Sequence, residues 1–169
     1  MTITLFAQPY DICATGFFFI SAEEYDEKAK TLTNAHGDPV EEFEIQFIDG
    51  AQIDCEMAKA VGINQANFRR LLQMFEEWDD HEKIKLAIAV GECGYAFDLD
   101  GDDIDLLDVD IYEEESLRVL AIRFVEDGLF DDIPEHLQSY IDHDAIARDL
   151  GVDYTETVIA GARLVYRCG

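Results

Sequence analysis

The stretch DLDGDDIDLLDVDIYEEE, residues 98–115, places ten carboxylates in eighteen positions and contains no lysine or arginine. Apolar residues are spaced through it, at Ile104, Leu106, Val109, Ile111 and Tyr112. A disordered acidic tail has few such side chains, so the stretch is predicted to be attached to a core. Its alternation predicts a half-exposed strand over residues 105–112. The acids before Ile104 are expected on a turn.

The acidity is concentrated in the second half of the chain. Residues 76–156 contain 26 acids and five bases, whereas residues 51–75 contain two acids and three bases. Halophilic adaptation would distribute acids over every surface, so this concentration favours a shaped negative surface. The formal charge of −26 opposes compaction through self-repulsion and repels nucleic acid and anionic membranes. Basic proteins are therefore the expected partners, and direct nucleic-acid or membrane binding is not expected.

The chain is nevertheless predicted to fold. Hydrophobic residues make up 49% of the sequence and aromatic residues 11%, which is far from the composition of disordered proteins. The length of 169 residues suits one ordinary domain or a row of two to three small ones. No signal sequence and no apolar run long enough to cross a bilayer is recognisable. A cytoplasmic protein is therefore expected.

The first fifty residues predict a small α+β unit. Strands are expected at ITLFAQPYD (residues 3–11) and at 42–47, where residues alternate in character, and a further strand is expected at Gly16–Ile20. Ser21 and Glu24 have capping-box spacing and are expected to open a helix that reaches about Thr33.

The middle of the chain, residues 51–90, changes to helical spacing with breaks near Gly62 and at residues 79–80. Asn64 is the expected N-cap of a helix with an apolar stripe formed by Phe68, Leu71, Leu72 and Phe75. Residues 91–104 are expected to form a connection.

The last third predicts short helices followed by strands. Ser116 is expected to cap a helix over residues 117–125, and two short helices are expected at 133–140 and 142–150. Gly151 is well placed to end the last helix in the left-handed conformation. Residues 155–166 are rich in strand-forming side chains.

Catalytic and metal-binding patterns do not assemble. Asp98–Gly101 begins like an EF-hand loop, but placing Gly101 at the sixth position puts Ala96 first and Leu107 twelfth, where Asp and Glu are required. The histidines and cysteines lack metal-ligand spacing, and nucleophile-elbow, P-loop and dinucleotide-binding motifs are absent. We expect a protein that is not an enzyme and holds no metal or cofactor.

Residues 58–71 permit a rival interpretation as a helix-turn-helix, with Ala58 at the packing position and Gly62 in the turn. The second helix would offer polar groove readers, namely Asn64, Gln65, Asn67, Arg69 and Arg70. Any two helices joined at a glycine give this pattern, and few bases are present to offset the negative charge near phosphates. A DNA-binding regulator therefore remains an alternative.

Three segments together resemble one protein family: TITLFAQPYDICATGFFF (residues 2–19), GDPVEEFEIQFID (37–49) and FVEDGLFDDIPEHLQSYIDHDAIARDL (124–150). The chain is similar through them to the ArdA antirestriction proteins of conjugative plasmids and transposons. The resemblance extends from Thr2 to Arg167.

This resemblance implies an α+β fold arranged as an elongated chain of three small subdomains. They are an antiparallel sheet plus helix over residues 1–60, a helical middle over 61–103, and a mixed sheet and helices with a dimerisation surface over 104–169. It also implies an acidic homodimer that mimics DNA and competitively occupies the site formed by the specificity and methyltransferase subunits of type I restriction-modification enzymes. Cleavage of incoming mobile-element DNA is thereby blocked. A general acidic sequestrant of basic proteins is the other alternative.

Two sets of residues are assigned on this interpretation. The DNA-mimic surface is expected at Asp79, Asp80, Glu82, Glu92, Asp98, Asp100, Asp102, Asp103, Asp105, Asp108, Asp110, Glu113, Glu114 and Glu115. The family's antirestriction motif is carried over onto residues 126–140, with Glu126, Asp127, Gly128, Leu129, Phe130, Asp131, Asp132, Ile133, Pro134, Glu135, Leu137 and Tyr140. Its acids are expected to face outward, and its apolar residues to make core or dimer contacts.

Overall fold

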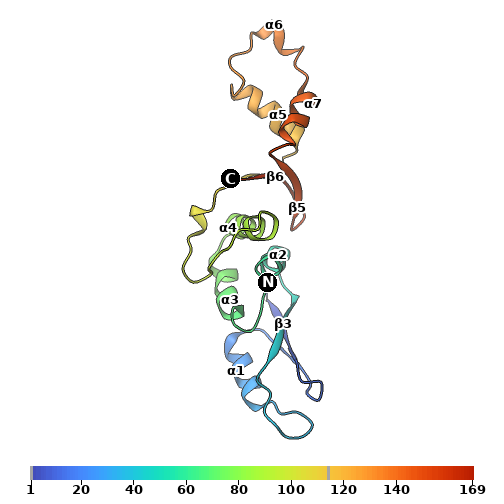
Figure 1. Ribbon diagram of the computed structural model, residues 1–169, viewed down its shortest axis with the longest axis vertical. Helices are drawn as coiled ribbons and strands as arrows, with labels where there is room; N and C mark the ends of the chain where they lie inside the picture. The colour runs from blue at the N-terminus through green and yellow to red at the C-terminus, as the bar shows by residue number, and fades with distance from the viewer. Residues whose placement is uncertain (1, 114) are drawn as a thin grey trace. The chain divides into compact units, whose positions relative to one another are not determined.

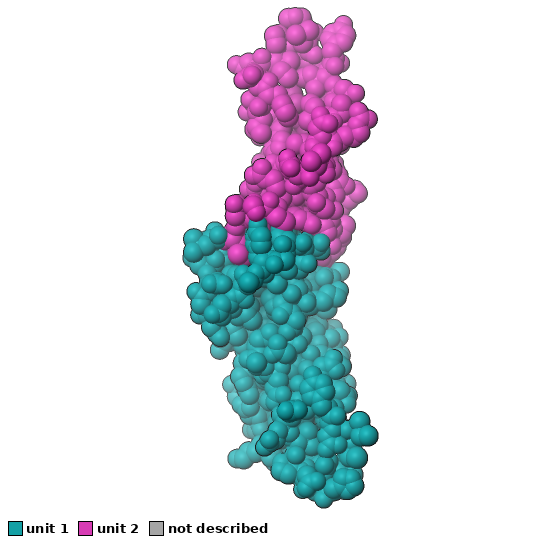
Figure 2. Space-filling view, in the orientation of Figure 1, with its two compact units in different colours: residues 1–106 teal, residues 107–169 magenta. Residues whose placement is uncertain are grey.

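The computed structural model describes residues 2–113 and 115–169 and has an α+β fold, with helices and two antiparallel three-stranded sheets (Figure 1). The α+β fold class is thus confirmed. Contacts divide the chain into a first unit, residues 1–106, and a second unit, residues 107–169 (Figure 2). The expected boundary at residues 60–61 lies inside the first unit, and the arrangement of three subdomains stays a prediction.

The sheet of the first unit consists of β1 (Thr4–Pro9), β2 (Phe17–Phe19) and β3 (Phe43–Asp49), in the order β2-β1-β3. Alternate residues face inward, so that Leu5, Ala7, Phe19 and Ile45 are buried. Tyr25 and Phe68 pack against them and complete a core rich in aromatic rings. Phe68 belongs to the helical segment, which therefore contributes to the core of the N-terminal sheet.

Helix α1 (Ala22–Thr31) begins where the capping-box spacing predicts. The Glu24 amide donates to the Ser21 hydroxyl at 3.2 Å. The Glu24 carboxylate accepts from the Ile20 amide at 2.8 Å, one residue before the amide that a capping box uses. The helix ends two residues earlier than expected.

Helices α2 (Gln52–Val61) and α3 (Phe68–Glu77) are separated at Gly62, which has φ +67. The prediction that Asn64 is the N-cap is wrong, because α3 begins at Phe68 and its N-cap is Asn67. The Asn64 side chain instead accepts from the amides of Ala66 and Asn67, at 2.8 and 3.2 Å. It thus closes the turn that precedes the helix.

Helix α4 (Asp80–Leu86) continues into a π-helical segment, η1 (Ala87–Glu92), and a short 3-10 helix, η2 (Ile104–Leu106), follows later. The strand predicted over residues 105–112 therefore begins later than expected, at Val109 of β4 (Val109–Glu113). The Asp103 carboxylate accepts from the Asp105 amide, and the Leu106 amide donates to the Asp103 carbonyl, at 3.0 and 3.1 Å. These local bonds form a turn in place of a strand.

The second unit contains β4 (Val109–Glu113), α5 (Leu117–Glu126), α6 (Glu135–Gln138), α7 (His143–Leu150), β5 (Thr155–Ile159) and β6 (Ala162–Cys168). The strands pair antiparallel in the order β4-β6-β5. Leu120 and Phe124 of α5 pack on Val165 of β6. The predicted Ser116 cap is present, because the Ser116 hydroxyl accepts from the Val119 amide at 3.2 Å.

Two expectations for the second unit are corrected. Gly151 is right-handed, with φ −62, and so does not end α7 in the left-handed conformation. The backbone continues into further turns, in which the amides of Asp153 and Tyr154 donate to the Leu150 carbonyl. The helix expected at 133–140 spans only Glu135–Gln138, preceded by Pro134, which has no amide to donate.

Candidate functional site

The acidic turn, residues 98–105, is held by its own carboxylates. Asp98 accepts from the Asp100 amide at 3.1 Å, and Asp102 accepts from the Asp98 amide at 2.7 Å. Such side-chain bonds to nearby amides are typical of aspartate in turns. Asp98, Asp100, Asp102, Asp103 and Asp105 are all exposed. The turn therefore holds a run of carboxylates at the surface in a defined backbone conformation.

The acidic turn is attached to the first unit through one apolar side chain and two bases. Ile104 is buried. The Arg70 guanidinium donates to the Leu99 carbonyl at 3.1 Å, and the Lys85 ammonium donates to the Asp105 carbonyl at 3.4 Å. Arg70 also lies 3.8 Å from the Asp100 carboxylate, a long ion pair in exposed surroundings. The bases thus bind mainly to backbone and leave the carboxylates pointing to solvent.

A second group of acids lies at the N-terminus of α4. Asp79 accepts from the Glu82 amide and Glu82 accepts from the Asp79 amide, both at 2.9 Å. Together they form a capping box that satisfies two amides at the helix end. Asp80 follows in the first turn and is exposed, as is Glu92 at the end of η1. Asp79 and Glu82 therefore have a structural role in addition to their charge.

The remaining expected acids belong to the second unit. Asp110 forms a 2.6 Å ion pair with Arg167, whose guanidinium also lies over the Tyr154 ring. The hydrogen bond to the Asp110 carboxylate raises the pKa of Arg167. Glu115 pairs with Arg123 at 3.6 Å, while Asp108 and Glu113 are exposed. Glu114 lies outside the described residues. Asp110 and Glu115 are thus partly neutralised within the chain.

The motif segment, residues 126–140, begins at the end of α5 with two backbone bonds. The Leu129 amide donates to the Phe124 carbonyl and the Gly128 amide to the Val125 carbonyl, at 3.0 and 3.2 Å. With φ +77 at Gly128, this is a Schellman motif, which requires a left-handed residue at that position. Asp131 also has a positive φ, +66, a conformation that costs about 1 kcal/mol or more outside glycine.

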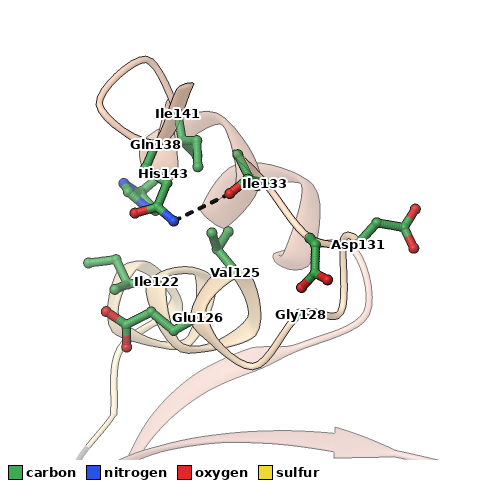
Figure 3. Close-up of a pocket in the computed structure, with 10 residues that line it drawn as sticks. Ile122, Val125, Glu126, Gly128, Asp131, Ile133, Gln138, Ile141 and His143 are labelled. Atoms are coloured by element: carbon green, nitrogen blue, oxygen red, sulfur yellow. Dashed lines mark hydrogen bonds between the residues drawn. The ribbon is translucent and has the colours of Figure 1, made fainter. Parts of the chain in front are cut away.

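The motif segment lines a cavity of about 340 Å³ together with Ile141, His143 and residues of α5. Figure 3 shows Ile122 and Val125 of α5 on one side, with Ile133, Gln138 and Ile141 across from them. The Gln138 amide group donates to the Ile133 carbonyl at 3.4 Å. Glu126, Asp131 and Asp132 also line the cavity.

The apolar residues of the motif segment are mostly at the surface. Leu129, Phe130, Leu137 and Tyr140 are exposed, with Phe130 at 47% and Tyr140 at 83%. The expected core contacts are therefore absent for these four described residues, whereas Ile133 of the same motif is half-buried and lines the cavity. The alternative, dimer contacts, stays a prediction. The motif acids Glu126, Asp127, Asp131, Asp132 and Glu135 are exposed, as expected.

The polar side chains proposed as groove readers are engaged inside the chain. The Gln65 side chain accepts from the Phe43 amide at 3.0 Å and donates to the Glu41 carbonyl at 2.8 Å. Arg69 pairs with Asp26 at 2.6 Å and lies over the Phe68 ring. Together with the bonds of Asn64, Asn67 and Arg70, these contacts give the residues structural roles and remove support for the helix-turn-helix alternative.

Sequence reasoning missed two features of the first unit. One is an ion pair between Asp54 and Lys83, whose side chains are each 7% exposed. The other is an aromatic pair, Phe6 and Phe18, on the outer face of the first sheet. The sequence predicted that both Phe residues lie on strands, but it could not indicate that residues 2–113 and 115–169 leave this face of the sheet largely exposed. In residues 2–113 and 115–169, no group of three or more His, Cys, Asp or Glu could hold a metal ion, and no helix is long and apolar enough to cross a membrane.

Comparison with known protein families places most of the chain within a described family. A family model described as "Antirestriction protein (ArdA)" matches residues 16–163. This range includes the acidic turn, the capping acids and the whole motif segment. None of the curated proteins compared with the chain matches it.

Proposed function

The chain belongs to the ArdA antirestriction protein family, and we propose that it acts as a DNA mimic on type I restriction-modification enzymes. Membership assigns it to non-catalytic proteins that counteract restriction enzymes. In the proposal, its carboxylates occupy the DNA-binding site formed by the specificity and methyltransferase subunits. Cleavage of incoming mobile-element DNA is then blocked in the cytoplasm without covalent chemistry.

The acidic turn is the observation that carries this proposal. Arg70 and Lys85 bind its backbone carbonyls, so the bases hold the turn in place while its five aspartates remain exposed. Fixed charges lose less conformational entropy on binding than charges on a mobile tail. B-DNA carries one charge per roughly 1.7 Å of helix axis, so 26 net charges correspond to about 13 base pairs.

Dimerisation is part of the proposal. Two chains would present twice this charge, equal to about 26 base pairs by the same relation, to an enzyme that contacts DNA on two sides. The exposed apolar side chains of the motif segment support a self-contact, since a second chain would remove their apolar surface from water. A two-fold dimer uses the same patch on both chains.

Electrostatic competition explains how such a surface would work. Complementary potentials speed the encounter between an acidic inhibitor and a basic channel. The affinity of the chain for the enzyme should fall as salt rises, as the affinity of DNA does, because salt screens the attraction between the carboxylates and the basic channel. Single charges should matter little, since exposed ion pairs typically contribute less than about 1 kcal/mol each.

The test is displacement of labelled duplex DNA from a purified type I enzyme at increasing salt. We expect complete displacement at low salt, and a steep rise of the inhibition constant with salt once it is corrected for the affinity of the DNA at each salt concentration. A basic protein unrelated to restriction serves as control, because equal binding to it would instead support general sequestration. A gel shift of duplex DNA by this chain alone would support the helix-turn-helix alternative. Failure to displace DNA at low salt would refute the mimic.

A further inference from the structure

The first sheet has one covered face and one open face. The open face consists of the alternate residues that point away from the core, namely Phe6 and Gln8 of β1, Phe18 of β2, and Glu44, Gln46 and Ile48 of β3. Strand register places Phe6 between Phe18 and Gln46, and Gln8 opposite Glu44. Phe18 is 56% exposed and Ile48 is 48% exposed.

The aromatic rings on the open face are held in a fixed arrangement. The centroids of Phe6 and Phe18 lie 4.7 Å apart with an interplanar angle of 55°. Gly16 lies against Phe6 so closely that an added Cβ would come 2.5 Å from the Phe6 ring and from the Ala7 carbonyl oxygen. The backbone carbonyl of Phe18 also accepts from the Lys28 ammonium at 2.8 Å. Rigid aromatic side chains of this kind are efficient contact residues.

The charge around the open face restricts what can cover it. Residues 1–50 contain ten acids and two bases, and Lys28, one of these bases, already pairs with Glu24 at 2.6 Å. Glu44 lies on the open face itself, and Asp49 ends β3. A second copy of this chain would bring the same acids together, and such like-charge contacts are unfavourable. A partner with an apolar centre and a basic rim would match both features.

We infer that the open face, centred on Phe6, Phe18 and Ile48, is a docking surface for a basic protein surface on the inhibited restriction enzyme. This inference rests on the proposed function and adds an apolar contact to its electrostatic mechanism. Burial of apolar side chains is far less sensitive to salt than attraction between exposed charges. The open face therefore supplies the part of the affinity that persists when salt screens the carboxylates.

The experiment measures the inhibition constant in the DNA-displacement assay at low and at raised salt. Phe18→Thr removes the ring and keeps a side chain suited to a strand, and Ile48→Thr tests the same face from β3. Phe18→Tyr keeps the aromatic contact. Val158→Thr, at an exposed strand position of the second unit, is the matched control. Circular dichroism and thermal unfolding establish that each variant is folded.

We expect Phe18→Thr and Ile48→Thr to weaken inhibition, Phe18→Thr by roughly 30-fold as for an aromatic interface residue, by a similar factor at both salt concentrations. Phe18→Tyr and Val158→Thr should inhibit like the wild type. Full potency of folded Phe18→Thr and Ile48→Thr would overturn the docking surface while leaving the carboxylate mimic intact. Equal losses in Val158→Thr would also overturn it. If the wild-type chain displaces no DNA, both the proposed function and this surface are refuted.

Discussion

The Lys83 ammonium lies 2.7 Å from the Asp54 carboxylate in the interior of the first unit. The same ammonium donates to the Phe75 carbonyl at 2.7 Å. Because Asp54 belongs to α2, Phe75 to α3 and Lys83 to α4, one buried charge links three helices. The Asp54 oxygen nearest to this ammonium accepts no hydrogen bond of good geometry. The contact is therefore a close ion pair without a well-directed hydrogen bond.

This arrangement predicts strong coupling between Asp54 and Lys83. Asp54→Asn leaves a buried ammonium without its counter-charge and should lower the free energy of unfolding by about 3–5 kcal/mol. Asp54→Leu combined with Lys83→Met removes both charges and should cost much less. Urea denaturation of Asp54→Leu alone, Lys83→Met alone and the double variant completes the cycle. Additive effects would show that the pair is not coupled.

Charge neutralisation in the acidic turn should act only collectively. Any single Asp→Asn change at residues 98–105 keeps the acceptor oxygen used in the turn and should alter the inhibition constant less than about fivefold. Changing all five aspartates to asparagine should weaken inhibition by roughly 100-fold or more and flatten its dependence on salt.

The matched control for the neutralised turn replaces the same five aspartates by glutamate. This set keeps the charge but lengthens the side chains that bond to nearby amides. DNA displacement by the glutamate set should stay close to that of the wild type. If the glutamate set loses as much potency as the asparagine set, the local conformation of the turn, and not its charge, determines inhibition.

The exposed ring of Phe130 should contribute to a dimer. Phe130→Glu places a charge in the proposed self-contact and should weaken association by roughly 30-fold, as for a central aromatic residue of an interface. Val152→Glu, also exposed in the second unit, is the control and should leave association unchanged. Analytical ultracentrifugation over a concentration series measures both. An unchanged dimer in Phe130→Glu would exclude this residue from the contact.

Glu24 should give the first unit a defined dependence on pH. Its hydrogen bond from Lys28 and the bond from the Ile20 amide lower the pKa of the carboxyl below 4.5. The folded state then binds a proton less readily than the unfolded state, so the stabilisation is present above pH 4.5 and is lost as pH falls through the folded pKa.

Glu24→Gln is therefore expected to reduce the free energy of unfolding near neutral pH and to have a smaller effect well below pH 4.5. Urea denaturation at both pH values measures this difference. Glu27→Gln on the same helix is the control, since the Glu27 carboxylate forms no ion pair among the described residues. A loss at low pH as large as that near neutrality would contradict this role of Glu24.

Local sequence signals predicted the parts of the fold that depend on neighbouring residues. The caps at Ser21 and Ser116 follow from side chains that reach amides three residues away. Gly151 was predicted wrongly because a glycine after a helix is left-handed only where the chain leaves the helix at that residue. Here the backbone continues through Gly151 into further turns, in which the amides of Asp153 and Tyr154 donate to the Leu150 carbonyl.

For the candidate site, too, the sequence predicted local features and not the contacts between distant residues. The exposed aspartates of the acidic turn follow from composition and alternation, whereas their attachment by Arg70 and Lys85 depends on contacts 29 and 20 residues apart. The exposure of Phe130 and Tyr140 also follows from tertiary structure, because apolar spacing alone suits a buried face equally well. The contact between Phe6 and Phe18 depends on the register of β1 with β2, which local patterns in the sequence do not reveal.

The outer strands of the two small sheets affect the solubility of the molecule. Each sheet has two outer strands, β2 and β3 in one and β4 and β5 in the other, and outer strands readily recruit foreign strands into aggregates. Strong like charge keeps such molecules apart. Mutations that bring the chain toward neutrality would thus have two costs, loss of the proposed DNA mimicry and precipitation of the chain.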